Sequence, residues 1–351
     1  MSGSGQAPIG VDVTVPNVAR MYDYYLGGKD NFAADRAAAE RTLAVVPGLR
    51  RGILENRRFL RRVVRDLAAE AGVSQFLDIG VGLPTQGAVH EVAREANPAA
   101  RTVYVDNDPV VVSHGQALLT LAHQSIMVNA DLRDPAALLA LPQVRAHLDF
   151  TRPVAVLLIA VLHFVAGDDD PAAIVAAVRD AIPAGSYLAI SHIGSDFFPD
   201  STAMDRAVTV YQRANEHVFP RSKTEILGFF DGLELVDPGL VPKHEWRPVL
   251  GETVGQTPNI SWGGVGRKLR ALSPSRPAFT HQAGAAASIL VRVSSGAGTS
   301  PRTCASTAPR TPVVCAATSI AATPHPMMSA RKTPCSAATA TGSGDPPPGS
   351  A

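Results

Sequence analysis

Residues 75–87, QFLDIGVGLPTQG, decide the fold of this chain. They begin with a short apolar run that predicts a buried strand. An acidic residue and two closely spaced glycines follow, and then a segment that can start a helix. A strand, a glycine turn and a helix in this order form the first half of a nucleotide-binding βαβ unit. Glycines suit such a turn because a ligand approaches the backbone closely and the turn needs backbone angles closed to other residues.

The chain beyond this stretch alternates between predicted strands and predicted helices. Strands are predicted at 76–79, 101–106, 125–129, 153–159, 185–192, 233–236 and 260–265. Helices are predicted at 84–96, 109–121, 134–141, 170–182, 202–215 and 224–230. The run at 153–159 is the most apolar, as expected for a central parallel strand that is buried on both faces. The alternation predicts an α/β fold with a doubly wound, Rossmann-like, mostly parallel sheet.

Three helices are predicted before the alternation begins, at 15–26, 30–46 and 50–71. The third has apolar residues at helical spacing with arginines between them. We interpret these arginines as a solvated face and not as a binding patch. The predicted organisation is a flexible leader at 1–14 and one domain at 15–268. Within that domain a helical segment, 15–72, precedes a Rossmann-like core, 73–268.

The composition changes after residue 268. Residues 269–351 are mainly Ala, Ser, Thr, Pro and Gly, which cannot bury enough apolar surface to offset the entropy lost on ordering. We therefore expect a disordered, low-complexity tail. Of the 32 basic and 31 acidic residues, seven basic and one acidic lie in this tail, so residues 1–268 carry 25 basic and 30 acidic residues, a formal net charge of −5.

The charge and the cysteines bound the possible partners and the compartment. A mildly acidic body offers no broad attraction to nucleic-acid backbones, so no DNA partner is expected. No apolar run is long enough to span a bilayer, and the N-terminus lacks the basic and apolar regions of a secretory signal. All three cysteines lie in the tail, without the spacing of a zinc site. These features predict a cytoplasmic protein without a membrane partner.

The acidic residue in the opening stretch separates two classes of cofactor. A dinucleotide brings a pyrophosphate, which favours a helix N-terminus without a nearby carboxylate and a glycine at the position of Thr85. Asp78 stands two residues before Gly80 and disfavours a phosphate. It suits S-adenosyl-L-methionine, which carries an ammonium and a sulfonium. The pattern D-x-G-x-G, with Gly80 and Gly82, therefore favours the methyl donor.

Two further strand ends support this choice. Asp106 ends the second predicted strand, where a carboxylate can accept hydrogen bonds from two ribose hydroxyls. Asp131 follows the third strand, where it can accept from an adenine amino group, whereas Asp108 favours the N-cap of the next helix. The carboxyl ends of parallel strands meet at one edge, so Asp78, Asp106 and Asp131 are expected there together. The candidate cofactor-binding residues are Asp78, Gly80, Gly82, Asp106, Asn107, Asp131, Leu132 and Ala160.

The chain resembles the class I S-adenosylmethionine-dependent methyltransferases. More narrowly, it is similar to the actinobacterial S-adenosyl methyltransferase family once filed as a domain of unknown function. The narrow resemblance is carried by ARMYDYYLGGKDNFAADR (19–36), ENRRFLRRVVR (55–65), FLDIGVGLPTQG (76–87), VYVDNDPVVVSHGQALL (103–119), ADLRDP (130–135), VAVLLIAVLHFV (154–165) and WGGVGRK (262–268). It implies a seven-stranded sheet with an N-terminal helical extension that binds S-adenosyl-L-methionine. Pro84 departs from the broader class, in which a third loop glycine is common.

Methyl transfer to an oxygen acceptor usually needs a base that takes the acceptor's proton. His163, just beyond the fourth predicted strand, and His192, at the end of the fifth, are the candidate catalytic residues. No metal is expected, because the adjacent carboxylates at 168–170 are typical of helix caps and no acidic cluster has magnesium-site spacing.

The N-terminal segment is the predicted lid over cofactor and acceptor. The candidate substrate or lid residues are Arg20, Tyr22, Tyr25, Asp30 and Asn31. The predicted function is methyl transfer to a small molecule, with O-methylation slightly ahead of N- or C-methylation. Two alternatives stay open: a regulatory protein that binds S-adenosylmethionine without transferring its methyl group, and an NAD-dependent dehydrogenase, which Asp78 and Thr85 disfavour.

Overall fold

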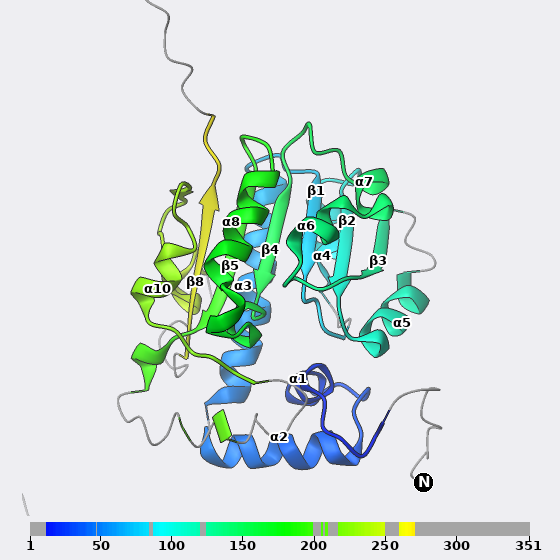
Figure 1. Ribbon diagram of the computed structural model, residues 1–351, viewed down its shortest axis with the longest axis vertical. Coiled ribbons are helices and arrows are strands. Elements are labelled where there is room, and N and C mark those ends of the chain that lie inside the picture. The colour runs from blue at the N-terminus through cyan, green and yellow to red at the C-terminus, as the bar shows by residue number, and fades with distance from the viewer. Residues whose placement is uncertain are drawn as a thin grey trace, which may run out of the picture. The chain divides into compact units, whose positions relative to one another are not determined.

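The computed structural model describes residues 12–46, 48–83, 87–119, 124–198, 205, 208–209, 217–249 and 260–270 (Figure 1). Most of the predicted leader, nearly all of the predicted helix at 202–215, and the predicted tail from residue 271 lie outside these ranges, as do Pro84 and Thr85. None of the described helices combines the length and the apolarity that crossing a bilayer requires.

Five parallel strands form the centre of the sheet, in the spatial order β3-β2-β1-β4-β5. They are β1 (Gln75–Ile79), β2 (Arg101–Asp106), β3 (Ser125–Asn129), β4 (Ala155–Ile159) and β5 (Tyr187–Ile193). β1 is buried along its whole length, as a strand covered by helices on both faces must be. These strands confirm the predicted Rossmann-like, mostly parallel sheet.

The remaining strands extend the sheet beyond β5. β8 (Ser261–Arg267) pairs with β5 in antiparallel orientation. Two short strands, β6 (Glu234–Leu235) and β7 (Val241–Pro242), both pair with the other side of β8. The described sheet thus has eight strands where seven were expected, because two fragments separated by a turn share the seventh position. β6 falls within the strand predicted at 233–236, whereas β7 was not predicted.

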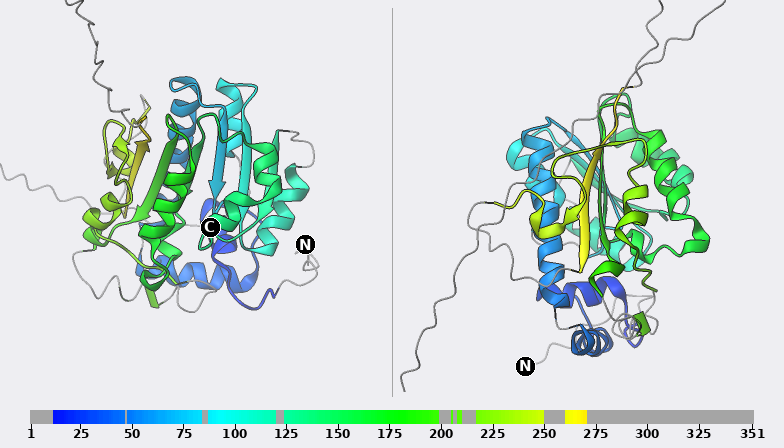
Figure 2. Two further views of the ribbon diagram at one scale, coloured as in Figure 1. Left: turned by 45° about the horizontal axis from the view of Figure 1, so that its top comes forward. Right: turned by 90° about the vertical axis from the view of Figure 1, so that its left-hand side faces the viewer.

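Helices cover the two faces of the sheet in two layers (Figure 2). α3 (Leu49–Ala69), α4 (Val89–Ala96) and α5 (Pro109–Leu118) contribute to one apolar core, together with Phe76 and Leu157 of the sheet. α6 (Pro135–Ala140), α7 (Pro142–His147), α8 (Pro171–Ala181) and α10 (Lys223–Gly228) contribute to the other, with Leu77 and Leu158. The 3₁₀ helices are η2 (Leu162–Phe164), η3 (Gly167–Asp169), η4 (Ser195–Phe197) and η5 (Lys243–Glu245).

Local hydrogen bonds set the helix starts, and one start differs from the prediction. α4 begins at Val89, later than predicted, because the Glu91 carboxylate accepts hydrogen bonds from the backbone N–H groups of Gly87 and Ala88 and so caps the helix there. Among the three adjacent carboxylates at 168–170, Asp170 is the N-cap of α8, as expected, and its side chain accepts a hydrogen bond from the Ala173 N–H. α7 was not predicted.

The N-terminal helices α1 (Val18–Leu26) and α2 (Ala33–Val45) lie beyond the carboxyl ends of the parallel strands (Figure 1). They have a small core of their own, in which Met21 and Tyr25 pack against Ala38 and Ile53. A buried ion pair between Arg20 and Asp35, at 2.8 Å, joins the two helices. The extension therefore lies at the edge of the sheet that carries the candidate site.

Candidate active site

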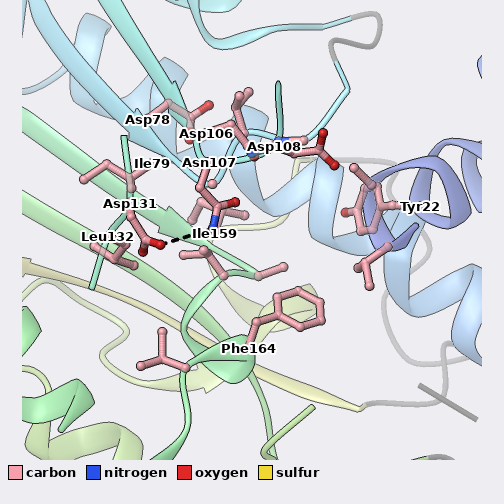
Figure 3. Close-up of a pocket in the computed structure, with 18 of the residues that line it drawn as sticks. Tyr22, Asp78, Ile79, Asp106, Asn107, Asp108, Asp131, Leu132, Ile159 and Phe164 are labelled. Carbon is pink, nitrogen blue, oxygen red and sulfur yellow. Dashed lines mark hydrogen bonds between the residues drawn. The ribbon is translucent and has the colours of Figure 1, made fainter. Parts of the chain in front are cut away.

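One pocket lies at the carboxyl ends of the strands, between the sheet and α1 (Figure 3). Its walls come from the ends of β1, β2, β3 and β4, from α3 and from α1. Eight of its lining residues are those predicted for the cofactor: Asp78, Gly80, Gly82, Asp106, Asn107, Asp131, Leu132 and Ala160. The fold brings this whole set together, as expected from strand ends that meet at one edge.

The two glycines after β1 serve different purposes. Both have a positive φ, +74° at Gly80 and +65° at Gly82, which disfavours any side chain. A Cβ at Gly80 would lie 2.3 Å from a methyl of Val161, so this glycine lets the β1 and β4 ends approach each other. A Cβ at Gly82 would meet nothing within 4 Å. Gly82 therefore leaves open space in the pocket wall.

Asp78 is buried at the floor of the pocket. The pKa of its carboxyl is raised to about 7, mainly by burial; the Arg57 charge opposes this rise and the Asp106 charge adds to it. A cation in the pocket would strongly stabilise the ionised form of this buried carboxyl, because it offsets part of the desolvation cost. The site is therefore electrostatically prepared for a positively charged ligand.

Asp106 fixes the glycine loop to the end of β2. One carboxylate oxygen accepts a 2.9 Å hydrogen bond from the Gly82 N–H, and the other accepts from the Asp108 N–H at 3.0 Å. Each oxygen keeps a further lone pair for a ligand. Asp108 caps α5, as predicted, by accepting from Val110, and it also accepts from the Asn17 amide at 2.5 Å. This last bond ties the sheet edge to the start of α1.

Asp131 is engaged on the other side of the pocket. Its carboxylate accepts from Arg133 Nε and Nη2, the shortest contact being 2.5 Å, and from the Asn107 amide at 3.4 Å. These bonds, led by that from Arg133, lower the pKa of the Asp131 carboxyl. Arg133 was not among the predicted residues, although it lines the pocket. It holds Asp131 ionised and oriented.

A chain of hydrogen bonds links the end of β4 to α1. Ala160 has a φ of +58°, and its N–H donates to the Ser191 hydroxyl at 3.0 Å. That hydroxyl donates to the Asn56 amide oxygen at 2.7 Å, and the Asn56 amide nitrogen donates to the Tyr22 hydroxyl at 3.1 Å. Strained backbone of this kind persists where neighbouring contacts hold it, and it is often found at functional sites. β4, β5, α3 and α1 are thereby registered with one another around the pocket.

Of the five predicted lid residues, Tyr22 alone is among the described residues that line the pocket. Its side chain faces the strand ends from the opposite wall (Figure 3). Arg20, Tyr25 and Asn31 are buried inside the extension, where Asn31 donates to Asp23 and Arg20 pairs with Asp35. Asp30 lies 3.5 Å from His114 on α5. These four residues are therefore absent from the described lining of the pocket and contact other parts of the extension and α5 instead.

The two predicted catalytic histidines do not line the pocket. The side chains of His163 and His192 are 5% and 1% exposed, and their rings pack edge to face with centroids 5.5 Å apart. His192 donates from Nδ1 to the Ile193 carbonyl and accepts at Nε2 from Arg221, which fixes it as a neutral ring. Burial lowers the pKa of both imidazoles, that of His192 to about 4. The expectation that they face the methyl group is corrected, because the core takes up both rings.

Sequence reasoning missed the lining residues that α3 and the segment before α1 supply. They include Asn17 before α1 and Asn56, Arg57 and Leu60 of α3, and Phe164 of η2 was missed as well. Asn56 carried a usable signal, since it is a polar residue on the apolar stripe of α3. Arg57 carried none, because it is one of several arginines along the same helix and only the tertiary fold turns it towards the pocket.

The lining fits S-adenosylmethionine on physical grounds. Asp78 prefers a cation, Gly82 leaves room beside the backbone, and Asp106 keeps free lone pairs for hydroxyl donors. In the described lining, Asp78, Asp106 and Asp108 would repel a pyrophosphate.

Comparison with known proteins agrees with this geometry. A family model described as S-adenosyl methyltransferase matches residues 4–269. Among solved structures, the chain is similar to a proposed methyltransferase from Thermobifida fusca YX, with 42% identity, a TM-score of 0.70, and coverage of 76% of this chain and 100% of the other. It is also similar to a DUF574 family protein from Streptomyces avermitilis MA-4680, with 40% identity, a TM-score of 0.69, and coverage of 73% and 99%. None of the curated proteins matches the chain.

Proposed function

The chain belongs to the S-adenosyl methyltransferase family, and from this premise we propose that it methylates a small organic molecule held beneath its N-terminal helices. The family fixes the enzyme class as an S-adenosylmethionine-dependent methyltransferase. It thereby decides against the NAD-dependent dehydrogenase. We place the reaction in the cytoplasm, as the sequence predicts.

The observation that carries the proposal is the position of the pocket between the strand ends and α1. Residues of the strand ends form one wall, and Asn17, Val18, Ala19 and Tyr22 of the α1 region form the opposite wall. A site covered in this way admits a small molecule more readily than a segment of a macromolecule, which would need an open groove. The side chains of Val18, Tyr22, Phe164 and Val165 give the acceptor side an apolar character.

When bound, S-adenosylmethionine supplies an activated methyl group on a sulfonium, so the protein has little covalent work to do. We propose that Asp78, Asp106 and Asp131 hold the donor at the strand ends. The Ala160 turn, fixed by Ser191 and Asn56, then positions the acceptor side, and α1 excludes water. Alignment and desolvation are the contributions expected from this chain's own residues.

We favour oxygen as the acceptor atom, in line with the sequence analysis, and we add that this oxygen is already ionised. His163 and His192 lie in the core, so an acceptor that needs neither of them as a base suits this site best. A carboxylate or an acidic phenol brings its oxygen already ionised and needs no proton transfer. Such molecules are the first acceptors to test.

Calorimetry tests the donor side. We expect S-adenosylmethionine and S-adenosylhomocysteine to bind in the micromolar range and NAD not to bind. Asp106→Ala should weaken both complexes at least tenfold, because the carboxylate that fixes the loop and faces the ligand is lost. Glu95→Gln, an exposed change on α4, is the control. Binding of NAD alone would overturn the assignment.

Transfer itself is tested with methyl-labelled S-adenosylmethionine and a panel of small carboxylates and phenols. The expected result is label in the small-molecule fraction, as a methyl ester or ether, together with S-adenosylhomocysteine. Label found only in protein or nucleic acid would refute the small-molecule proposal. Label on a nitrogen or carbon atom of a small molecule would support the small-molecule acceptor but refute oxygen as the methylated atom.

A further inference from the structure

Arg57 occupies a distinctive place in the pocket wall. It lies on α3, directly after Asn56, and it lines both the main pocket and a small cavity next to it. Asp78 also lines both spaces. A positive and a negative side chain thus stand together at the end of the pocket where β1 meets α3.

The guanidinium of Arg57 has few partners among the described residues. Its Nε atom is buried and makes no hydrogen bond there. Its guanidinium carbon lies 5.5 Å from the centre of the Tyr22 ring. A buried donor left without an acceptor costs free energy, which a ligand that supplies the acceptor would recover.

The other arginine in the described lining is already engaged. Arg133 forms hydrogen bonds to Asp131 through both Nε and Nη2. Within the described lining, Arg57 is therefore the cation available to an anionic group of a ligand. Its planar fork of donors matches the two oxygens of a carboxylate.

We propose that Arg57 binds the carboxylate of the methionine part of S-adenosylmethionine, while Asp78 binds the adjacent ammonium. The inference rests on the cofactor assigned above and deepens it. A zwitterion carries one charge of each sign on neighbouring atoms, and this end of the pocket presents one charge of each sign to receive it. Because Tyr22 packs on Arg57, α1 would then lie directly beside the bound methyl donor.

A purely structural role for Arg57 makes a different prediction. If Arg57 only packs on Tyr22 and balances the Asp78 charge, its loss should weaken every adenosyl ligand by a similar factor. If it binds the carboxylate, its loss should weaken only ligands that possess one. Decarboxylated S-adenosylhomocysteine keeps the adenosine, the sulfur and the amine and therefore separates the two roles.

The experiment measures the affinity of both ligands for the full-length protein and for Arg57→Met by calorimetry. We expect the wild-type protein to favour S-adenosylhomocysteine over its decarboxylated form by about 10–100-fold, as a charge-assisted pair should. Arg57→Met should reduce this preference to about threefold or less by weakening S-adenosylhomocysteine alone. Arg51→Met, an exposed change on the same helix, should leave the preference intact.

Each other outcome has a definite meaning. A folded Arg57→Met protein that keeps the wild-type preference overturns the inference, and so does a wild-type protein that shows no preference. Binding of neither ligand by the wild-type protein would instead overturn the proposed function. If Arg57→Met does not fold, Arg57→Gln, which keeps a polar side chain of similar reach, gives the same two readings.

Discussion

Asp78 illustrates how function is built into a single residue at the cost of stability. A carboxyl with a pKa near 7 in the folded protein and near 3.8 in the unfolded chain holds its proton more tightly when folded. The unfolded chain therefore releases this proton at lower pH. Rising pH between about 4 and 7 destabilises the ligand-free fold through this group, and falling pH removes the penalty.

Asp78→Asn should consequently stabilise the ligand-free protein while weakening the binding of S-adenosylmethionine. We expect a gain of about 1–2 kcal/mol in the free energy of unfolding at pH 7.5, where the buried charge is removed, and a smaller gain at pH 5. Urea unfolding at the two pH values measures it. A loss of stability at pH 7.5 would show that the Asp78 charge is well compensated in the free protein.

The two glycines of the loop give a matched pair of substitutions. Gly80→Ala should cost about 2–4 kcal/mol of stability, because the new Cβ meets Val161 and the positive φ disfavours it. Gly82→Ala should cost only about 1 kcal/mol but lower the affinity for S-adenosylhomocysteine at least tenfold, since its Cβ enters open pocket space. Urea unfolding and calorimetry on both variants separate the effects. Equal affinities would contradict the pocket role of Gly82.

At the scale of elements, α1 is attached to the core by polar contacts at its start. Asn17 caps α1 by accepting from the Arg20 N–H, and its amide nitrogen donates to Asp108 at the end of β2. The Tyr22 hydroxyl, one turn later, accepts from Asn56 of α3. The helix that covers the pocket is therefore positioned by the same strand end and helix that line it.

Asn17→Ala removes the cap and the bond to Asp108 together. We expect a loss of about 1–2 kcal/mol in the local stability of α1, and so roughly tenfold faster amide exchange at Met21–Leu26, with the sheet unaffected. Hydrogen exchange read by mass spectrometry measures this. Thr14→Ala, whose hydroxyl bonds locally to Asp12, is the control. Unchanged exchange in α1 would show that apolar packing alone holds it.

The sheet and the candidate cofactor residues at its carboxyl edge could be predicted from local sequence, because both depend on residues that are neighbours in the chain. An apolar run followed by Asp or Gly marks a strand end wherever it occurs, and parallel strand ends meet by topology. The lid differs, since Tyr22 and Tyr25 are three residues apart on one helix and only packing decides which faces the pocket. The orientations of His163 and His192 could not be predicted for the same reason. Side-chain direction at a strand end depends on residues far along the chain, such as Arg221.

At the scale of the whole molecule, Lys268 closes the described domain. Its ammonium donates to the carbonyls of Arg179, Asp180 and Ile182 at the end of α8, and its N–H donates to Ser186. The family model ends at residue 269, and the two solved relatives are covered almost completely without the remaining chain. We propose that the domain ends within a few residues of Lys268.

A chain ending at Arg270 should fold and bind as the full chain does, with an unfolding temperature within about 2 °C and affinity for S-adenosylhomocysteine within about twofold. A chain ending at Arg267 should lose several degrees, since the carbonyls at the end of α8 lose their donor. Calorimetry measures the unfolding temperatures of the full chain and of the chains that end at Arg270 and Arg267. Failure of the chain ending at Arg270 to fold would show that residues beyond it belong to the domain.

The shared seventh position of the sheet has a consequence for how copies of this protein behave towards one another. β8 is covered on its outer side by two strands of two residues each, separated by the turn at 236–240. One of those residues is Pro242, which has no N–H to offer. A strand from another copy meets a broken row of donors and acceptors there instead of a continuous template. This border of the sheet is therefore poorly suited to edge-to-edge aggregation.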